Sequence, residues 1–292
     1  PIWVHRSIQF MRSVESGDWS LVPQTGHPGI TTMALGALGV KITQWLRPVA
    51  ATEQLDWLSK PAWLAPENAA AFRRLHLFLP AGRVLVALTT SLGLVVVYLG
   101  TRRYLGERSA RWLGLLLALD PFFAGHGGLL HTDALQATFV LLAVILTLPD
   151  LRSAPQPSFR SVVAPELRGA QGVPGGRSIS LREAIRWMGI ALCLALAGLT
   201  KTLGLLVAPG LALALFLWGA GTWGKRVLRV GFIAVLSLCF LLGFYPTFLA
   251  APREAVTTLL QAVTYHEGIG LRDVYFLGTT RADPGPWFYP LV

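Results

Sequence analysis

The chain has 292 residues, of which 53% are hydrophobic and only 14% are charged, whereas soluble domains carry roughly 25% charged residues. This composition excludes an ordinary soluble domain and predicts an all-α, polytopic membrane helix bundle. The net charge of +10 does not indicate a nucleic-acid-binding surface, because the basic residues cluster between apolar runs, where they determine membrane topology. The two cysteines, Cys193 and Cys239, lie within apolar runs and favour neither a disulfide nor a metal site.

The N-terminal part of the chain is predicted to lie against the membrane surface. Residues 1–24 repeat apolar and aromatic side chains at spacings of three and four, as in amphipathic helices of the membrane interface. A turn rich in Gly and Pro, residues 25–29, follows. The next apolar stretch, residues 30–46, is interrupted by Lys41 and Gln44. We expect it to lie at the surface or to re-enter the membrane rather than to cross it.

Six apolar runs close to the ~20 residues needed to cross a bilayer come next. They cover residues 79–100, 111–129, 133–149, 184–200, 203–219 and 229–249. The pair Asp120-Pro121 interrupts the second run and marks a candidate helix break.

The predicted organisation has three parts. These are a juxtamembrane or re-entrant region, residues 1–78, a six-span bundle, residues 79–249, and a final segment, residues 250–292, that leads into a truncated further span. A loop rich in Pro, Gly, Ser and Arg, residues 150–183, lies within the bundle region. The chain starts without a Met and stops inside a new apolar run, so we expect it to be a fragment of a longer protein.

Arginines and lysines gather in three of the connections between the apolar runs. These connections follow the first, third and fifth runs, so they lie on one side of the membrane. The positive-inside rule makes that side cytoplasmic. The N-terminal and interfacial segments, the connection before Asp133, Lys201 and the segment after residue 249 are then expected outside.

Titratable side chains collect on this predicted outer side, most of the histidines among them. Asp133 opens the third run, where a carboxylate beside hydrocarbon costs about 3 kcal/mol unless it meets water, a partner or a ligand. It is either a functional carboxylate or a cap of the following helix. Lys201 separates two apolar runs, and it either extends to the headgroups or holds a phosphate.

His131 stands two residues before Asp133 and is either a functional imidazole or an ordinary interfacial side chain. Two ligand-type residues at this spacing do not define a metal site, so no cofactor is implied, and a divalent cation is left open. Together, a carboxylate and nearby basic groups suit a reaction in which a hydroxyl loses its proton while an anionic leaving group is stabilised.

Several segments in this order resemble a known family. They are GDW and QTGHPG, then LLLALDPF followed by HTDALQATFVLLAV, then LTKTLGLLVAPGL. The chain resembles the type C glycosyltransferase superfamily, in particular its protein O-mannosyltransferase and aminoarabinose-transferase branch. The likeness extends over most of the chain. The chain lacks the N-terminal span and the first-loop acidic motif of that family.

The resemblance implies an inverting glycosyltransferase that takes its sugar from a polyprenyl-phosphate donor on the extracytoplasmic face. Asp133 matches an acidic position at the outer start of a span, and Lys201 matches a basic position near the donor phosphate. The family's general base is an acidic residue of the first outer loop, which would stand upstream of Pro1, so the base is not identified. The sequence assigns catalysis to Asp133 and His131. The candidate substrate- and phosphate-binding residues are Lys201, Arg6, His27, Arg272 and His266.

The alternative function is a transporter or flippase-like protein for a lipid-linked or small anionic substrate. Transporters usually place polar residues at mid-depth, whereas the charged residues here stand at the ends of the runs. The expected location is the plasma membrane, or the endoplasmic reticulum membrane in a eukaryote. The expected partners are the lipid-linked donor, membrane lipids and an acceptor protein, lipid or glycan, without nucleic acid.

Overall fold

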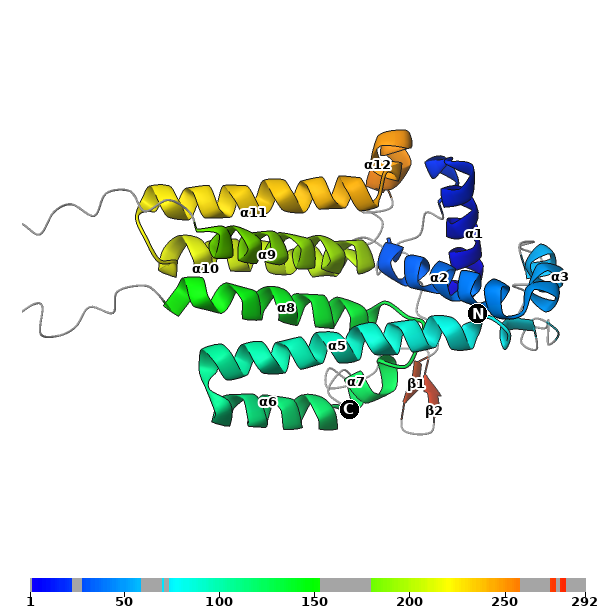
Figure 1. Ribbon diagram of the computed structural model, residues 1–292, viewed down its shortest axis with the longest axis horizontal. Coiled ribbons are helices and arrows are strands. Elements are labelled where there is room, and N and C mark those ends of the chain that lie inside the picture. Colours follow the sequence, from blue (N-terminus) through cyan, green and yellow to red (C-terminus); the bar gives the residue numbers. More distant parts are fainter. Residues whose placement is uncertain are drawn as a thin grey trace, which may run out of the picture.

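The computed structural model describes residues 2–22, 28–58, 70, 74–152, 180–257, 274–276 and 279–281. Six helical segments run side by side along its long axis (Figure 1). They are α5 (Leu79–Leu105), α6 (Glu107–Leu119), α8 (Asp133–Arg152), α9 (Leu181–Thr200), α10 (Val207–Trp218) and α11 (Trp223–Phe244).

Four of these helices, α5, α8, α9 and α11, are long and apolar enough to cross a membrane. The protein is therefore an all-α membrane helix bundle, as its composition predicts. A short antiparallel pair, β1 (Val274–Phe276) with β2 (Thr279–Arg281), was not expected from the sequence. The segment predicted to begin a further span lies outside the described residues.

The second predicted run, residues 111–129, is not one helix. It is divided at Asp120-Pro121 into α6 and the short α7 (Pro121–His126). Proline has no N–H to continue the helical hydrogen bonds. The Asp120 carboxylate instead accepts a hydrogen bond from the N–H of Phe122 at 2.8 Å, which caps the new helix.

The fifth predicted run, residues 203–219, is also divided. Its first part is the 3-10 helix η4 (Thr202–Leu206), which turns back against the end of α9 before α10 begins. A Cβ at Gly204 would lie 2.5 Å from the carbonyl oxygen of Ala197, so only glycine permits this approach. The remaining boundaries differ from the predicted ones by a few residues, and the largest shift is in α11.

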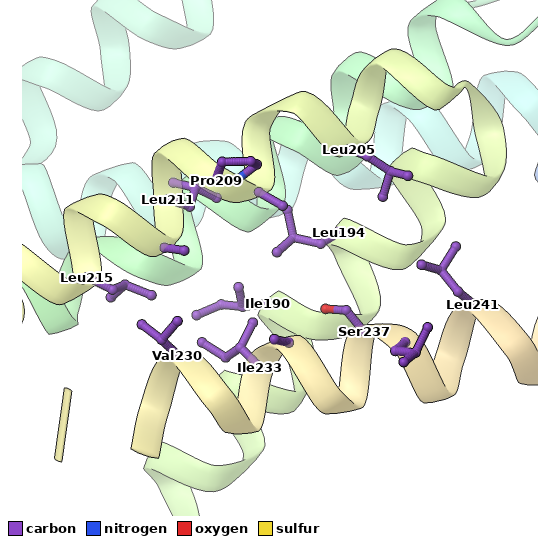
Figure 2. A pocket seen from close by; sticks show the side chains of 14 residues that line it. Ile190, Leu194, Leu205, Pro209, Leu211, Leu215, Val230, Ile233, Ser237 and Leu241 are labelled. Carbon is purple, nitrogen blue, oxygen red and sulfur yellow. The ribbon is translucent and has the colours of Figure 1, made fainter. Parts of the chain in front are cut away.

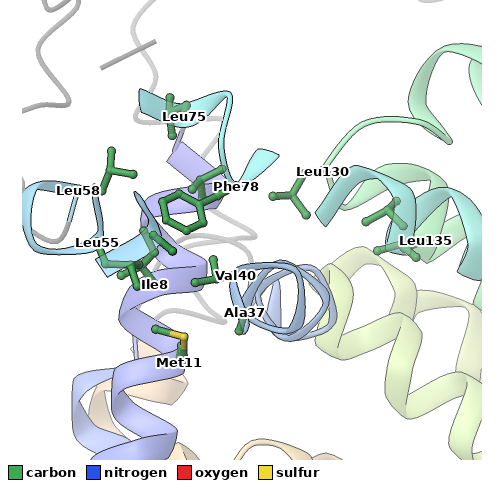
Figure 3. Close-up of a cluster of buried hydrophobic side chains, with 13 residues drawn as sticks. Ile8, Met11, Ala37, Val40, Leu55, Leu58, Leu75, Phe78, Leu130 and Leu135 are labelled. Carbon is green, nitrogen blue, oxygen red and sulfur yellow. The ribbon is translucent and has the colours of Figure 1, made fainter. Parts of the chain in front are cut away.

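The N-terminal region consists of α1 (Ile2–Ser16), η1 (Trp19–Leu21), α2 (Ile30–Leu46) and α3 (Pro48–Leu58). Figure 1 shows α1 lying across the direction of the bundle helices, as predicted for an interfacial helix. A core of buried side chains, shown in Figure 3, joins α1, α2 and α3 to the start of α5 and to Leu130 and Leu135. This core fixes the N-terminal helices over one end of the bundle.

The two ends of the bundle differ in chemistry. At one end lie α1, α7, the start of α8, the end of α9 and α12 (Thr247–Ala250) (Figure 1). At the other end lie the α5–α6 turn, the end of α8, the start of α9 and the α10–α11 turn, which carry the arginine-rich sequences. The structure thus separates Asp133 from the basic connections, as predicted. Which end faces the cytoplasm stays a prediction.

A buried charge cluster holds the basic end together. Asp150 of α8, 3% exposed, lies 2.7 Å from Arg186 of α9 and 3.5 Å from Arg229 of α11 through its Oδ1 atom. Arg229 also donates to the carbonyl of Ala220 at 3.0 Å, and its guanidinium lies over the ring of Trp187. One carboxylate therefore connects three helices that are distant in sequence.

Candidate active site

The candidate site is built on an ion pair between the start of α8 and the end of α9. The ammonium group of Lys201 donates to Oδ1 of Asp133 at 3.0 Å. Their side chains are 21% and 24% exposed, so the pair is largely buried but still open to solvent. Two residues 68 positions apart are thus brought together because α8 and α9 run in opposite directions and pack closely.

Local structure fixes the position of Lys201. Its backbone N–H still bonds to the carbonyl of Ala197 at 3.0 Å, while its extended backbone ends α9. Its carbonyl accepts from Gly204 of η4 at 2.8 Å. The preceding hydroxyl, Thr200 Oγ1, lies 2.6 Å from Thr31 Oγ1 of α2. The lysine is therefore held between α9, the following 3-10 turn and the N-terminal region.

The carboxylate of Asp133 also faces His131. The Nδ1 atom of His131 lies 3.4 Å from Oδ2 of Asp133, within ion-pair distance but without a well-directed hydrogen bond. The hydroxyl of Thr132 donates to Oδ1 at 3.3 Å. No backbone N–H in the described part of the chain bonds to this carboxylate, so Asp133 is not a hydrogen-bonding cap, but it stands in the first turn of α8, where a negative charge favours the helix dipole. Its carboxylate connects an imidazole, a hydroxyl and an ammonium group.

The ionisation of His131 suits proton acceptance. Partial burial disfavours the imidazolium and lowers the pKa of His131 below its ordinary 6.5. Asp133 acts in the opposite direction, while His126 and Lys201 reinforce the lowering. His131 is therefore neutral at pH 7. Because the unfolded chain binds this proton more readily, the stability that neutral His131 contributes is complete above pH 6.5. It is lost as the pH falls through the lowered pKa.

Two aromatic rings flank His131, whose side chain is still 40% exposed. The indole of Trp3 in α1 approaches it edge-on at 6.2 Å between ring centroids, and His126 of α7 lies at 6.1 Å. Trp3 packs against Gly29, whose backbone has a φ of +61°, and a Cβ there would lie 2.4 Å from the indole. The guanidinium of Arg6 lies 4.9 Å above the same ring. The interfacial helix thus covers one side of the site.

The predicted site residues are only partly brought together. Asp133, His131 and Lys201 form one cluster. Arg6 is linked to this cluster by Trp3, whose ring contacts both Arg6 and His131. The other three predicted binding residues, His27, His266 and Arg272, lie outside the described residues. His5 is buried elsewhere, with Nδ1 3.1 Å from the carbonyl of Leu58.

Two apolar cavities adjoin the end of α9. One, of about 210 Å³, is lined by Gly198, Leu199 and Leu205, which flank Lys201 in sequence, together with residues of α11. The other, of about 330 Å³, lies deeper between α9, α10 and α11 and is shown in Figure 2. They share Leu205, Leu238 and Leu241 in their walls, so they adjoin as one apolar groove. Lys201 does not line this groove, but Leu199 and Leu205, close to it in the chain, do.

Metal binding gains no support from the described part of the chain. No group of three or more His, Cys, Asp and Glu side chains stands there in a position to hold a metal ion. The divalent cation left open by the sequence stays untested.

Sequence reasoning did not identify Trp3 or Thr31 as neighbours of the site. Trp3 belongs to the segment that was expected only to lie against the membrane surface, and Thr31 belongs to a stretch without any distinguishing pattern. Their roles depend on how α1 and α2 pack over the bundle, which a local sequence pattern does not encode.

Comparison with known proteins finds no matching family model, no matching curated protein and no matching solved structure.

Proposed function

We propose that the protein is an integral-membrane inverting glycosyltransferase that moves a sugar from a polyprenyl-phosphate donor to an acceptor hydroxyl. The reaction is placed at the bundle end opposite the arginine-rich connections, on the extracytoplasmic face. One observation carries the proposal. A lysine paired with a carboxylate stands two residues after Leu199, which lines an apolar groove, so a candidate site for a phosphate lies close in the chain to a candidate site for its hydrocarbon tail.

The leaving group needs no proton from the protein. The acceptor oxygen forms a bond to the anomeric carbon on the face opposite the phosphate, and the bond from that carbon to the phosphate oxygen breaks. Polyprenyl phosphate then leaves with the electron pair and an added negative charge, which needs a cation rather than a proton. Lys201 supplies this cation, and Arg6 lies nearby.

The proton of the acceptor hydroxyl needs a base. Within the described residues His131 suits this role best, because its imidazole is neutral at pH 7 and stands beside the Asp133 carboxylate. Asp133 stabilises the imidazolium that forms and keeps Lys201 in place. In the family that the chain resembles, the base is an acidic residue of the first outer loop, and such a residue would share or replace the role of His131.

The transporter alternative has less support. Transporter sites are usually formed by broken helices near the bilayer midplane. Within α5, α8, α9 and α11, the charged residues stand in the first two turns or the last turn, and the intervening segments are apolar. Two breaks among the described helices of the bundle carry charge. Lys201 lies at the end of α9 rather than in its middle, and Asp120, between α6 and α7, uses its carboxylate to cap α7.

Protection of Lys201 from an amine-reactive reagent tests the proposal. Farnesyl phosphate is expected to reduce labelling of Lys201 severalfold, because its phosphate binds the ammonium group while its tail enters the groove. Farnesol, which lacks the phosphate, is expected to protect far less. Lys225, at the opposite end of the bundle, serves as an internal control whose labelling stays constant, and quantitative peptide mass spectrometry gives both values.

Unchanged labelling of Lys201 at saturating farnesyl phosphate would contradict the phosphate role. Equal protection by farnesol would show that the groove binds hydrocarbon without recognising phosphate, which would also contradict it.

A further inference from the structure

A third cavity, with Arg83 and His76 in an otherwise apolar wall, lies at the same end of the bundle as Asp133, on the start of α5. Its volume is about 380 Å³. It is lined by His76, Leu79, Pro80, Arg83, Val84, Ala87 and Gly128. None of these residues lines the apolar groove between α9, α10 and α11, so the two sites are separate.

Arg83 is fixed on one side only. Its Nε donates to the carbonyl of Gly128 at 2.7 Å, and no carboxylate of the described residues pairs with its guanidinium. The two terminal nitrogens retain their N–H donors for another acceptor. A guanidinium of this kind binds a phosphate through two parallel hydrogen bonds, which is the geometry that an arginine fork favours.

The remaining wall of the cavity is apolar. Leu79, Val84 and Ala87 follow one another along α5, and Val84 is 56% exposed. Because Arg83 and His76 stand near the end of a membrane-spanning helix, they lie at the depth of the lipid headgroups, and the apolar residues lie towards the hydrocarbon. A free phosphate ion would use only the polar part of this cavity, whereas a phospholipid would use both parts.

We propose that this cavity binds an anionic phospholipid, with the headgroup phosphate on Arg83 beside His76 and an acyl chain along Leu79, Val84 and Ala87. The site has a direct connection to the candidate active site. Gly128, which receives the hydrogen bond from Arg83, belongs to the turn that carries His131 and leads into Asp133. A lipid bound to Arg83 would thus contact the side chain that holds this turn through Gly128. The binding itself does not depend on the proposed function.

Photolabelling in vesicles tests this site. The protein is reconstituted in phosphatidylcholine containing a trace of phosphatidylglycerol with a photoreactive acyl chain, and labelled peptides are mapped by mass spectrometry. Labelling of residues 79–87 is expected to exceed that by the corresponding phosphatidylcholine probe. Arg83→Gln should lower it about fivefold, the effect of one arginine on an anionic lipid. Excess inorganic phosphate should not compete.

Two further variants keep the result interpretable. Arg108→Gln removes another exposed arginine without an ion pair among the described residues, at the opposite end, and should leave this labelling unchanged. Ala87→Leu fills part of the apolar wall without touching Arg83 and should lower labelling if a lipid chain lies there. Equal labelling by both probes, or unchanged labelling in Arg83→Gln, would show that only bulk lipid covers this surface. Competition by inorganic phosphate would show a site for the free ion instead.

Discussion

Replacement of Asp133 by Asn is expected to reduce sugar transfer by roughly 10³-fold while the protein stays folded. The amide has the same shape as the carboxylate, but it leaves Lys201 without its counter-ion at 3.0 Å and gives His131 no charge to stabilise its protonated form. Both effects fall on the reaction rather than on packing. The measurement is transfer from a polyprenyl-phosphate sugar by the protein, with thermal unfolding as the test of folding.

Asp120→Asn is the matched control for this variant. Asp120 stands at the same end of the bundle and caps α7, and asparagine caps a helix almost as well as aspartate. Its activity should stay close to that of the parent. Parental turnover by Asp133→Asn would remove Asp133 from the reaction, and equal losses in both variants would point to a general disturbance of this end of the bundle.

Replacement of Asp150 by Asn is expected to lower the free energy of unfolding by about 3–5 kcal/mol. The change leaves Arg186 and Arg229 buried without a negative charge, at 20% and 5% side-chain exposure. Loss of one partner from a buried pair costs far more than the pair contributes, because the remaining charge stays out of water. Unfolding in mixed micelles of increasing SDS content measures the change.

Glu107→Gln provides the contrast. Glu107 pairs with Arg102 and Arg111, but these side chains are 41%, 58% and 75% exposed, so its loss should cost less than about 1 kcal/mol. If Asp150→Asn were as mild as Glu107→Gln, water or lipid headgroups would solvate the two arginines, and the cluster would not join the three helices.

The sequence predicted those parts of the fold that depend on residues close together in the chain. The apolar runs around α5, α8, α9 and α11 approach the thickness of a bilayer, so their lengths alone predicted these four long helices. The break at Asp120-Pro121 was also visible, because an Asp-Pro pair both ends one helix and caps the next. The 3-10 turn after Lys201 was not predicted, since it depends on the contact between Gly204 and Ala197, two residues of different elements.

The candidate site was predictable only in part for a related reason. Because successive spans run in opposite directions, the sequence predicted that Asp133 and Lys201 lie at the same end of the bundle. Their direct pairing, however, depends on the packing of α8 against α9. Asp150 was interpreted as the beginning of a loop, and Arg186 and Arg229 as topology signals. Their burial as one cluster arises from the close packing of three helix ends, which the charge pattern of single segments does not reveal.

The position of the site relative to the membrane decides the proposed reaction, and cysteine accessibility measures it directly. Gly125, exposed in α7, and Ser180, exposed at the start of α9, are replaced singly by cysteine in a protein without Cys193 and Cys239. With a membrane-impermeant maleimide, Gly125→Cys should react in intact cells and Ser180→Cys only after permeabilisation. Reaction of both from the same side, or of Ser180→Cys alone in intact cells, would contradict an extracytoplasmic site.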